Sequence, residues 1–118
     1  MGHYHDVLSD LREPTMSLQS AIGETWSAFT ALNAAAVADG AVPKALKEAA
    51  ALAISVVKRC DGCIAYHARA AARAGATAEQ VGEMLALTVL LDGGSATVYA
   101  PRAWEAFQEF ANERSGRI

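Results

Sequence analysis

Residues 58–67 read KRCDGCIAYH and contain both cysteines of the chain, Cys60 and Cys63, with His67 four residues after the second. Steps of three and four residues place all three side chains on one face of a helix. A helix that begins near Cys60 would therefore gather two thiols and an imidazole into one small site. Two cysteines this close together indicate a redox-active dithiol or a metal site rather than a structural cross-link.

The composition of the whole chain indicates helices around this segment. Hydrophobic residues make up 53% of the 118 residues and 27 residues are alanine, while β-branched residues never alternate with polar ones over the length of a strand. Alanine is the strongest helix former but adds little bulk to a core. We expect one domain over residues 1–118, with an all-α fold of about five to six helices that assembles into a homo-oligomer.

Two helices are expected before residue 40. A short helix over residues 3–12 should end before Pro14, because the residue preceding a proline is driven away from helical geometry. A long helix over residues 15–39 should be closed by Gly40. Steps of three or four between apolar side chains predict one apolar face on this long helix, formed by Leu18, Ile22, Trp26, Phe29 and Leu32.

The helix expected over residues 44–57 is apolar on almost every side, so it should lie in the interior. Pro43 suits its first helical position. The next helix should run from about residue 60 to residue 74 and end at Gly75 in a left-handed conformation.

Two more helices complete the expected fold. Thr77 and Gln80 have the spacing of a capping box, which predicts a helix from residue 78 to about residue 91. The last helix should start near Ser95 and continue to about residue 113, with Pro101 bending it or resetting its beginning. Residues 114–118 are expected to form a frayed tail.

Charge and hydropathy exclude several classes of function. The net charge is −3 and no basic stripe is present, so neither a nucleic acid nor an anionic membrane is an expected partner. The polar start of the chain does not resemble a secretory signal, and no apolar run approaches the roughly 18 residues that span a bilayer. We expect a cytoplasmic protein, and in a reducing cytosol a close cysteine pair is catalytic or metal-binding more often than structural.

The residues around the thiols suggest how they could be activated. The amino end of a helix, together with Lys58 and Arg59, favours the thiolate form of Cys60, whereas Asp61 opposes it. Gly62 leaves the backbone between the sulfurs free of a side chain, which would let a bulky substrate approach. His67 can exchange a thiol proton near neutral pH.

Glu48 is the one acidic side chain in the apolar segment over residues 44–57. Burial favours the protonated form of a carboxyl group, and a group of that kind suits a proton shuttle. The alternative is a solvated pairing with Lys44 one turn earlier. The spacing alone leaves both interpretations of Glu48 open.

These residues, taken together, resemble a known family. The pattern resembles the AhpD-like alkylhydroperoxidase branch of the carboxymuconolactone decarboxylase superfamily. It consists of Glu48, then eleven residues, the CDGC segment, three residues and His67, and it is followed by the turn at residues 75–81. The resemblance covers residues 43–111. It implies an all-α fold that assembles as a homotrimer or homohexamer. The chain departs from AhpD at Gly62, where AhpD has a histidine between its cysteines.

The resemblance also implies roles for four catalytic residues. Cys63 matches the thiol that attacks the peroxide, and Cys60 matches the partner thiol that closes a disulfide with it. His67 and Glu48 match the proton relay. The implied partners are an alkyl hydroperoxide substrate and a dithiol reductant, either a lipoylated protein or a thioredoxin-like donor. The implied chemistry requires no cofactor and no metal.

Two other interpretations remain open at this stage. Cys60, Cys63 and His67 could bind a metal ion, with Glu48 or one of the amino-terminal histidines, His3 or His5, as fourth ligand. The chain could instead be a regulatory oligomer whose dithiol only senses oxidants. Turnover of peroxide would distinguish an enzyme from a sensor.

Overall fold

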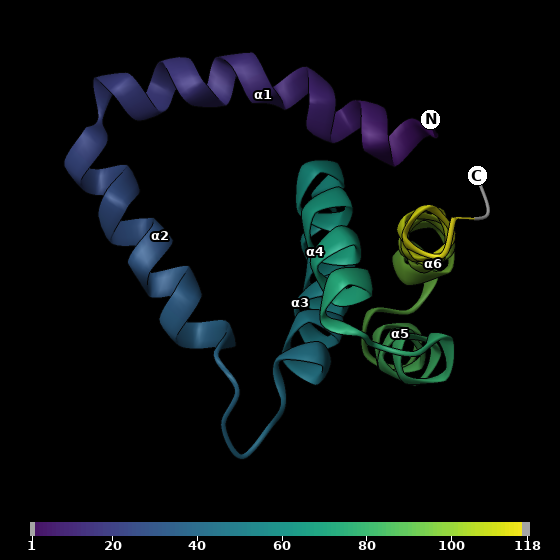
Figure 1. Cartoon of the computed structure of the whole chain (residues 1–118). Helices are drawn as coiled ribbons and strands as arrows, with labels where there is room; N and C mark the ends of the chain where they lie inside the picture. The colour runs from purple at the N-terminus through teal and green to yellow at the C-terminus, as the bar shows by residue number, and fades with distance from the viewer. Residues whose placement is uncertain (1, 117–118) are drawn as a thin grey trace.

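Six helices make up the computed structural model, which describes residues 2–116 (Figure 1). They are α1 (His3–Ala21), α2 (Gly23–Val37), α3 (Lys44–Lys58), α4 (Asp61–Ala74), α5 (Ala78–Asp92) and α6 (Gly94–Arg114). The residues described contain no strand. The expected all-α fold of about five to six helices is confirmed.

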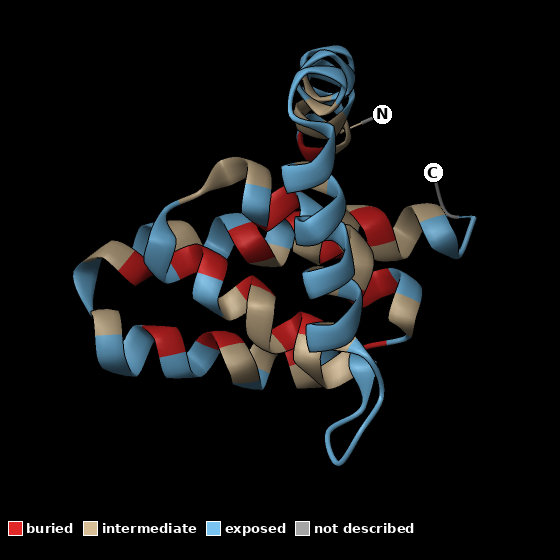
Figure 2. Ribbon diagram, turned by 90° about the vertical axis from the view of Figure 1, so that its left-hand side faces the viewer, coloured by how far each residue is buried: buried red, intermediate tan, exposed pale blue. Residues whose placement is uncertain are grey.

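Helices α3 to α6 pack together and form what we call the body of the molecule (residues 44–114). Helix α4 lies between α3 and α6, and α5 packs against both α3 and α6. Red, buried positions concentrate on the facing sides of these helices (Figure 2). Many of these positions are alanines, including Ala49, Ala65, Ala68 and Ala103, which lets the helices approach closely around larger side chains such as Leu52.

Helices α1 and α2 form what we call the arm (residues 3–37): α1 packs against α4 and α6, and α2 extends away from the body. Figure 1 shows α1 crossing one end of the body and α2 descending at a distance from α3 and α4. Within the described part of the chain, α2 packs only against α1 and α3. None of its residues is buried.

The predicted end of the first helix at residue 12 and the predicted start of the second at residue 15 are both wrong. Helix α1 does not end before Pro14 but continues through it to Ala21, and Ile22 rather than Pro14 separates the two helices, with φ −122° and ψ 31°. A proline inside a helix removes the hydrogen bond to the carbonyl four residues earlier. That carbonyl belongs to Asp10, and residues 9–14 are all exposed, so water can satisfy it.

The apolar face predicted for residues 15–39 is consequently divided between two helices. It also lies outside the core of the chain: Phe29 and Leu32 are 62% and 63% exposed, and Trp26 is only half-buried. The prediction of one apolar face on one long helix is therefore wrong.

The amino end of α1 is anchored to α6 by Glu109. The Glu109 carboxylate accepts hydrogen bonds from the backbone N–H groups of Tyr4, at 3.2 Å, and His5, at 2.7 Å. It therefore satisfies two of the four N–H groups that every helix leaves free at its start. Gly2 permits this approach, because a Cβ atom there would collide with the carboxylate. The Tyr4 side chain is buried in the core beneath.

Two local signals in the body are confirmed. Gly75 ends α4 with φ 92°, and Thr77 and Gln80 form the predicted capping box at the start of α5. Pro43, expected at the first helical position, instead precedes the helix with ψ 151°; α3 begins at Lys44, whose backbone N–H donates to Asp39 Oδ1 at 2.7 Å.

Helix α6 is continuous through Pro101 and neither restarts nor ends there. It extends to Arg114, so the predicted tail shortens to residues 115 and 116, and residues 117–118 lie outside the described range. No helix in residues 2–116 is long and apolar enough to cross a membrane.

Candidate functional site

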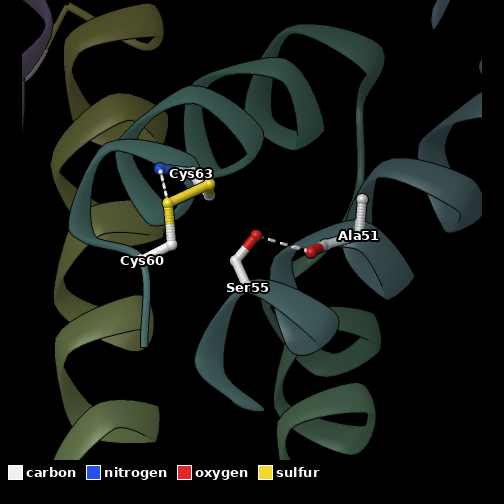
Figure 3. The surroundings of a disulfide bond; sticks show 4 residues. All are labelled: Ala51, Ser55, Cys60 and Cys63. Atoms are coloured by element: carbon white, nitrogen blue, oxygen red, sulfur yellow. Dashed lines mark hydrogen bonds between the residues drawn. A yellow bond between two sulfur atoms is a disulfide. The ribbon is translucent and has the colours of Figure 1, made fainter. Parts of the chain in front are cut away.

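Cys60 and Cys63 form a disulfide at the first turn of α4, with their sulfurs 2.09 Å apart (Figure 3). Cys60 is the residue that caps α4, and its sulfur accepts a hydrogen bond from the Cys63 backbone N–H at 3.2 Å. The Cys63 residue is exposed and the Cys60 residue only half-buried. An outside thiol or peroxide can therefore reach the pair at Cys63.

The corner between α3 and α4 depends on Arg59, which adopts a left-handed conformation with φ 54°. Its backbone N–H bonds back to α3, and its side chain reaches the turn between α5 and α6. There Nε donates to Ser95 Oγ at 2.8 Å, and the guanidinium lies 3.8 Å from Asp92. Arg59, one of the two cations expected to favour the Cys60 thiolate, is thus engaged with Ser95 and Asp92.

The structure brings Glu48 and His67 into direct contact. Glu48 Oε1 lies 2.8 Å from His67 Nδ1, which joins α3 to α4. Glu48 is 2% exposed. Of the two interpretations of Glu48, the surface pairing with Lys44 is therefore excluded. His67 follows Cys63 by one turn of α4, so the contact connects a buried carboxylate with the helix face that carries the sulfur.

Ser55 is a site residue that the sequence-based predictions missed. It is buried on α3, and its backbone carbonyl accepts a hydrogen bond from the Cys60 N–H at 3.3 Å. Figure 3 shows its hydroxyl donating to the Ala51 carbonyl, over 2.8 Å, beside the disulfide. Ser55 follows Glu48 by seven residues, which is two helical turns, and this spacing could have placed both polar side chains on one face.

Helix α1 forms a wall over the residues between the cysteines. A Cβ atom on Gly62 would lie 3.3 Å from Leu11 Cδ1, so Leu11 occupies the space next to this position. His3 Nε2 lies 3.5 Å from Asp61 Oδ2. The open approach expected at Gly62 is therefore wrong: the side chains of the arm border the backbone there.

The charge of Asp61 acts on Tyr4, which lies at the start of α1. Asp61 Oδ1 is buried without a hydrogen-bond partner. Burial, reinforced by the negative charge of Asp61, raises the pKa of Tyr4 to about 12. The phenol therefore stays protonated at neutral pH.

The metal interpretation receives no support from the geometry. No three His, Cys, Asp or Glu side chains in residues 2–116 are grouped so that they could hold a metal ion. The two sulfurs that would have served as ligands bind each other instead.

Comparison with known proteins agrees with the fold and shows the family. The sequence pattern of the carboxymuconolactone decarboxylase family matches residues 24–106, which is most of the chain. The chain belongs to the carboxymuconolactone decarboxylase family. This confirms the resemblance found in the sequence at the level of the family, which includes both decarboxylases and alkylhydroperoxidases.

Similar proteins are known from sequence and structure. An uncharacterized protein of Cupriavidus necator is 37% identical over 100 residues, which cover 85% of this chain and 88% of that protein. Uncharacterized protein 4 in the cox locus of Paracoccus denitrificans is 34% identical over 109 residues, covering 86% and 96%. The crystal structure of an apo carboxymuconolactone decarboxylase family protein from Legionella pneumophila superposes with a TM-score of 0.88 at 34% identity, covering 92% of this chain and 96% of that one.

Proposed function

We propose that this protein is a thiol-dependent peroxidase that reduces alkyl hydroperoxides through a Cys60–Cys63 dithiol/disulfide cycle. The observation that carries the proposal is the 2.8 Å contact between Glu48 and His67 on the helix face that bears Cys63. A dithiol alone would fit many roles. A dithiol beside a buried carboxylate–imidazole pair has the parts of a nucleophile with its own proton relay.

The proposed cycle has three steps. The Cys63 thiolate attacks the peroxide, forming an S–O bond and breaking the O–O bond, and the departing alkoxide takes a proton to leave as an alcohol. The Cys60 thiol then condenses with the Cys63 sulfenic acid, which forms the disulfide and releases water. A dithiol donor reduces the disulfide and is itself oxidised to a disulfide.

His67 and Glu48 handle the protons in this scheme. Nδ1 of His67 is occupied by Glu48, which leaves Nε2 as the nitrogen that exchanges protons with the thiol and the leaving oxygen. An imidazole held by a carboxylate is fixed in orientation as well as in tautomer. General acid–base help of this kind contributes about 10²- to 10⁴-fold to a rate.

The proposed setting follows from the same chemistry. The cycle uses only the two thiols and the relay, without a bound cofactor. A thiol enzyme of this type needs a reducing compartment, so we place it in the cytoplasm. Its electron donor would be a dithiol, either on a lipoylated protein or on a thioredoxin-like protein.

Steady-state turnover of cumene hydroperoxide, with dihydrolipoamide or thioredoxin as donor, tests the proposal. The unmodified protein should consume many equivalents of peroxide per chain, and Cys63→Ser should consume none. Without a donor, Cys60→Ser should reduce one equivalent and then stop, because its sulfenic acid has no second thiol in the chain with which to condense. A single oxidation per chain in the unmodified protein, with no turnover on any donor, would instead identify a sensor.

A further inference from the structure

Ser55 is one of two polar side chains buried in helix α3, and the other is Glu48. They are 3% and 2% exposed, on a helix face that otherwise buries apolar residues such as Leu52 and Val56. Glu48 has its partner in His67. Alanine, the strongest helix former and a frequent residue in this chain, would fill the place of Ser55 without a hydroxyl to satisfy. The Ser55 hydroxyl therefore needs a reason of its own.

The hydrogen bond that the hydroxyl makes adds little to the helix. Ser55 Oγ donates to the Ala51 carbonyl at 2.8 Å. That carbonyl lies four residues earlier, so in an α-helix it also accepts the Ser55 backbone N–H. A side-chain bond of this kind slightly destabilises a helix. The Ala51 oxygen stays satisfied if the hydroxyl turns to another acceptor, so turning costs little.

The other acceptors beside this hydroxyl are the sulfurs of the dithiol site. Arg59 forms the corner between α3 and α4, and Ser55 and Cys63 each lie four residues from it, at matching levels of the two helices. The Ser55 carbonyl accepts the Cys60 backbone N–H at 3.3 Å, which ties this turn of α3 to the start of α4. Figure 3 shows the hydroxyl in the space between the disulfide and Ala51.

Reduction changes the value of a sulfur as an acceptor. A disulfide sulfur is neutral and accepts weakly, which explains why the hydroxyl donates to a carbonyl in the oxidised protein. A thiolate carries a full charge, and hydrogen bonds to charged groups are roughly twice as strong as neutral ones. The Cys60 sulfur has a donor of its own in the Cys63 backbone N–H. Within residues 2–116 the Cys63 sulfur accepts no hydrogen bond, so it is the sulfur that lacks a donor.

We propose that Ser55 is a positioning residue for the thiol chemistry: once the disulfide is reduced, its hydroxyl turns from the Ala51 carbonyl to the Cys63 thiolate and stabilises the charge there. His67 takes the proton from the thiol, and Ser55 stabilises the anion that remains. When the disulfide forms again, the hydroxyl returns to Ala51. The inference rests on the proposed function, in which Cys63 is the nucleophile, but the thiolate can be measured without a peroxide.

The rate at which iodoacetamide alkylates Cys63, measured as a function of pH, tests this inference. The background is Cys60→Ser, in which Cys63 is the one thiol of the chain. Because the thiolate is the reactive form, the midpoint of the curve reports the charge on Cys63. Ser55→Ala should move the midpoint to higher pH by about one unit, which slows alkylation below the midpoint about tenfold. Ser55→Thr keeps a hydroxyl and should restore the original midpoint.

Thr88→Ala in the same background is the matched control. Thr88 is 4% exposed and donates to the Leu85 carbonyl at 2.6 Å, so it is also a buried hydroxyl bonded to its own helix. It lies on α5, which packs against α3 and α6 but not against α4 in the described part of the chain. The control should lose stability as Ser55→Ala does, by thermal unfolding, and keep the alkylation curve unchanged. Asp61 and His67, which also act on the thiol, are the same in every variant.

Two results would overturn the role of Ser55. One is an alkylation curve that is the same for Ser55→Ala and for the Thr88→Ala control. The other is a shift of equal size in Ser55→Thr, which would assign the effect to packing rather than to the hydroxyl. Failure of the proposed function is distinguishable from both: the protein would turn over no peroxide on any donor, while the alkylation midpoint would still depend on Ser55.

Discussion

The Glu48 carboxylate and the His67 imidazole meet at 2.8 Å across the interface between α3 and α4, although 19 residues separate them in the chain. When Glu48 is ionised it can only accept hydrogen bonds, and a neutral His67 then donates from Nδ1 and keeps its lone pair on Nε2. This contact fixes which nitrogen can serve the thiols. It also fixes the ring in place, because Glu48 itself is held in the core.

Replacing Glu48 by glutamine should separate its chemical role from its structural one. Glutamine keeps the shape and a hydrogen-bond acceptor but removes the carboxylate, so peroxide turnover should fall by about 10²-fold, within the range for acid–base groups. The measurement is kcat with cumene hydroperoxide, accompanied by the thermal unfolding midpoint. Glu83→Gln, an exposed carboxylate on α5, should leave kcat unchanged. Equal rates for the two variants would remove Glu48 from the relay.

Removing the Glu109 side chain should loosen α1. Glu109 caps two backbone N–H groups at the start of that helix, and losing a capping acceptor costs about 0.5–2 kcal/mol. Urea unfolding of Glu109→Ala should show a loss in this range. Glu105→Ala, one turn earlier on α6 and exposed, should cost less. A smaller loss for Glu109→Ala than for Glu105→Ala would show that the cap does not hold the arm.

Gly62 and Leu11 should behave as an energetically coupled pair. Alanine in place of glycine within a helix gains about 0.5–1 kcal/mol, but here the new Cβ would press on Leu11 at 3.3 Å. Gly62→Ala should therefore be close to neutral alone and clearly stabilising in a Leu11→Ala background. A double-mutant cycle by urea unfolding measures the coupling, and strictly additive effects would show that Leu11 does not restrict position 62.

Tyr4 should make the protein sensitive to alkaline pH. Its pKa is raised by burial to about 12, above the ordinary value of 10.0, so the folded state holds the phenol proton more tightly than the unfolded state. This contribution to stability is complete below pH 10 and is lost as pH rises from 10 towards 12. Urea midpoints measured on either side of pH 10 should fall less for Tyr4→Phe than for the unmodified protein. Tyr99→Phe is the control and should retain the full fall.

The sequence predicted the parts of the structure that depend on near neighbours. The capping box at Thr77, the left-handed Gly75 and the placement of both cysteines on the first turn of α4 all follow from spacings of three or four residues. The fixed spacing between Glu48 and the CDGC segment indicated that Glu48 belongs to the site. These features are local, so a single sequence contains them.

The sequence did not predict the features that depend on distant contacts. Pro14 was expected to end a helix, and the local rule fails because the freed carbonyl faces solvent. The pairing of Leu11 with Gly62 and of Glu109 with the start of α1 joins segments far apart in the chain. Ser55 was missed because its hydroxyl can be assigned to the site only once α3 is known to lie beside the disulfide.

The central claim is that Cys60 and Cys63 pass together from dithiol to disulfide when Cys63 reduces a peroxide. The most direct measurement mixes the fully reduced protein with one equivalent of cumene hydroperoxide and follows peroxide loss together with the intact mass. The account predicts rapid loss of the peroxide, formation of one alcohol per chain, and a protein lighter by two hydrogen atoms. Unchanged mass with two free thiols, or peroxide loss that is equally fast in Cys63→Ser, would contradict it.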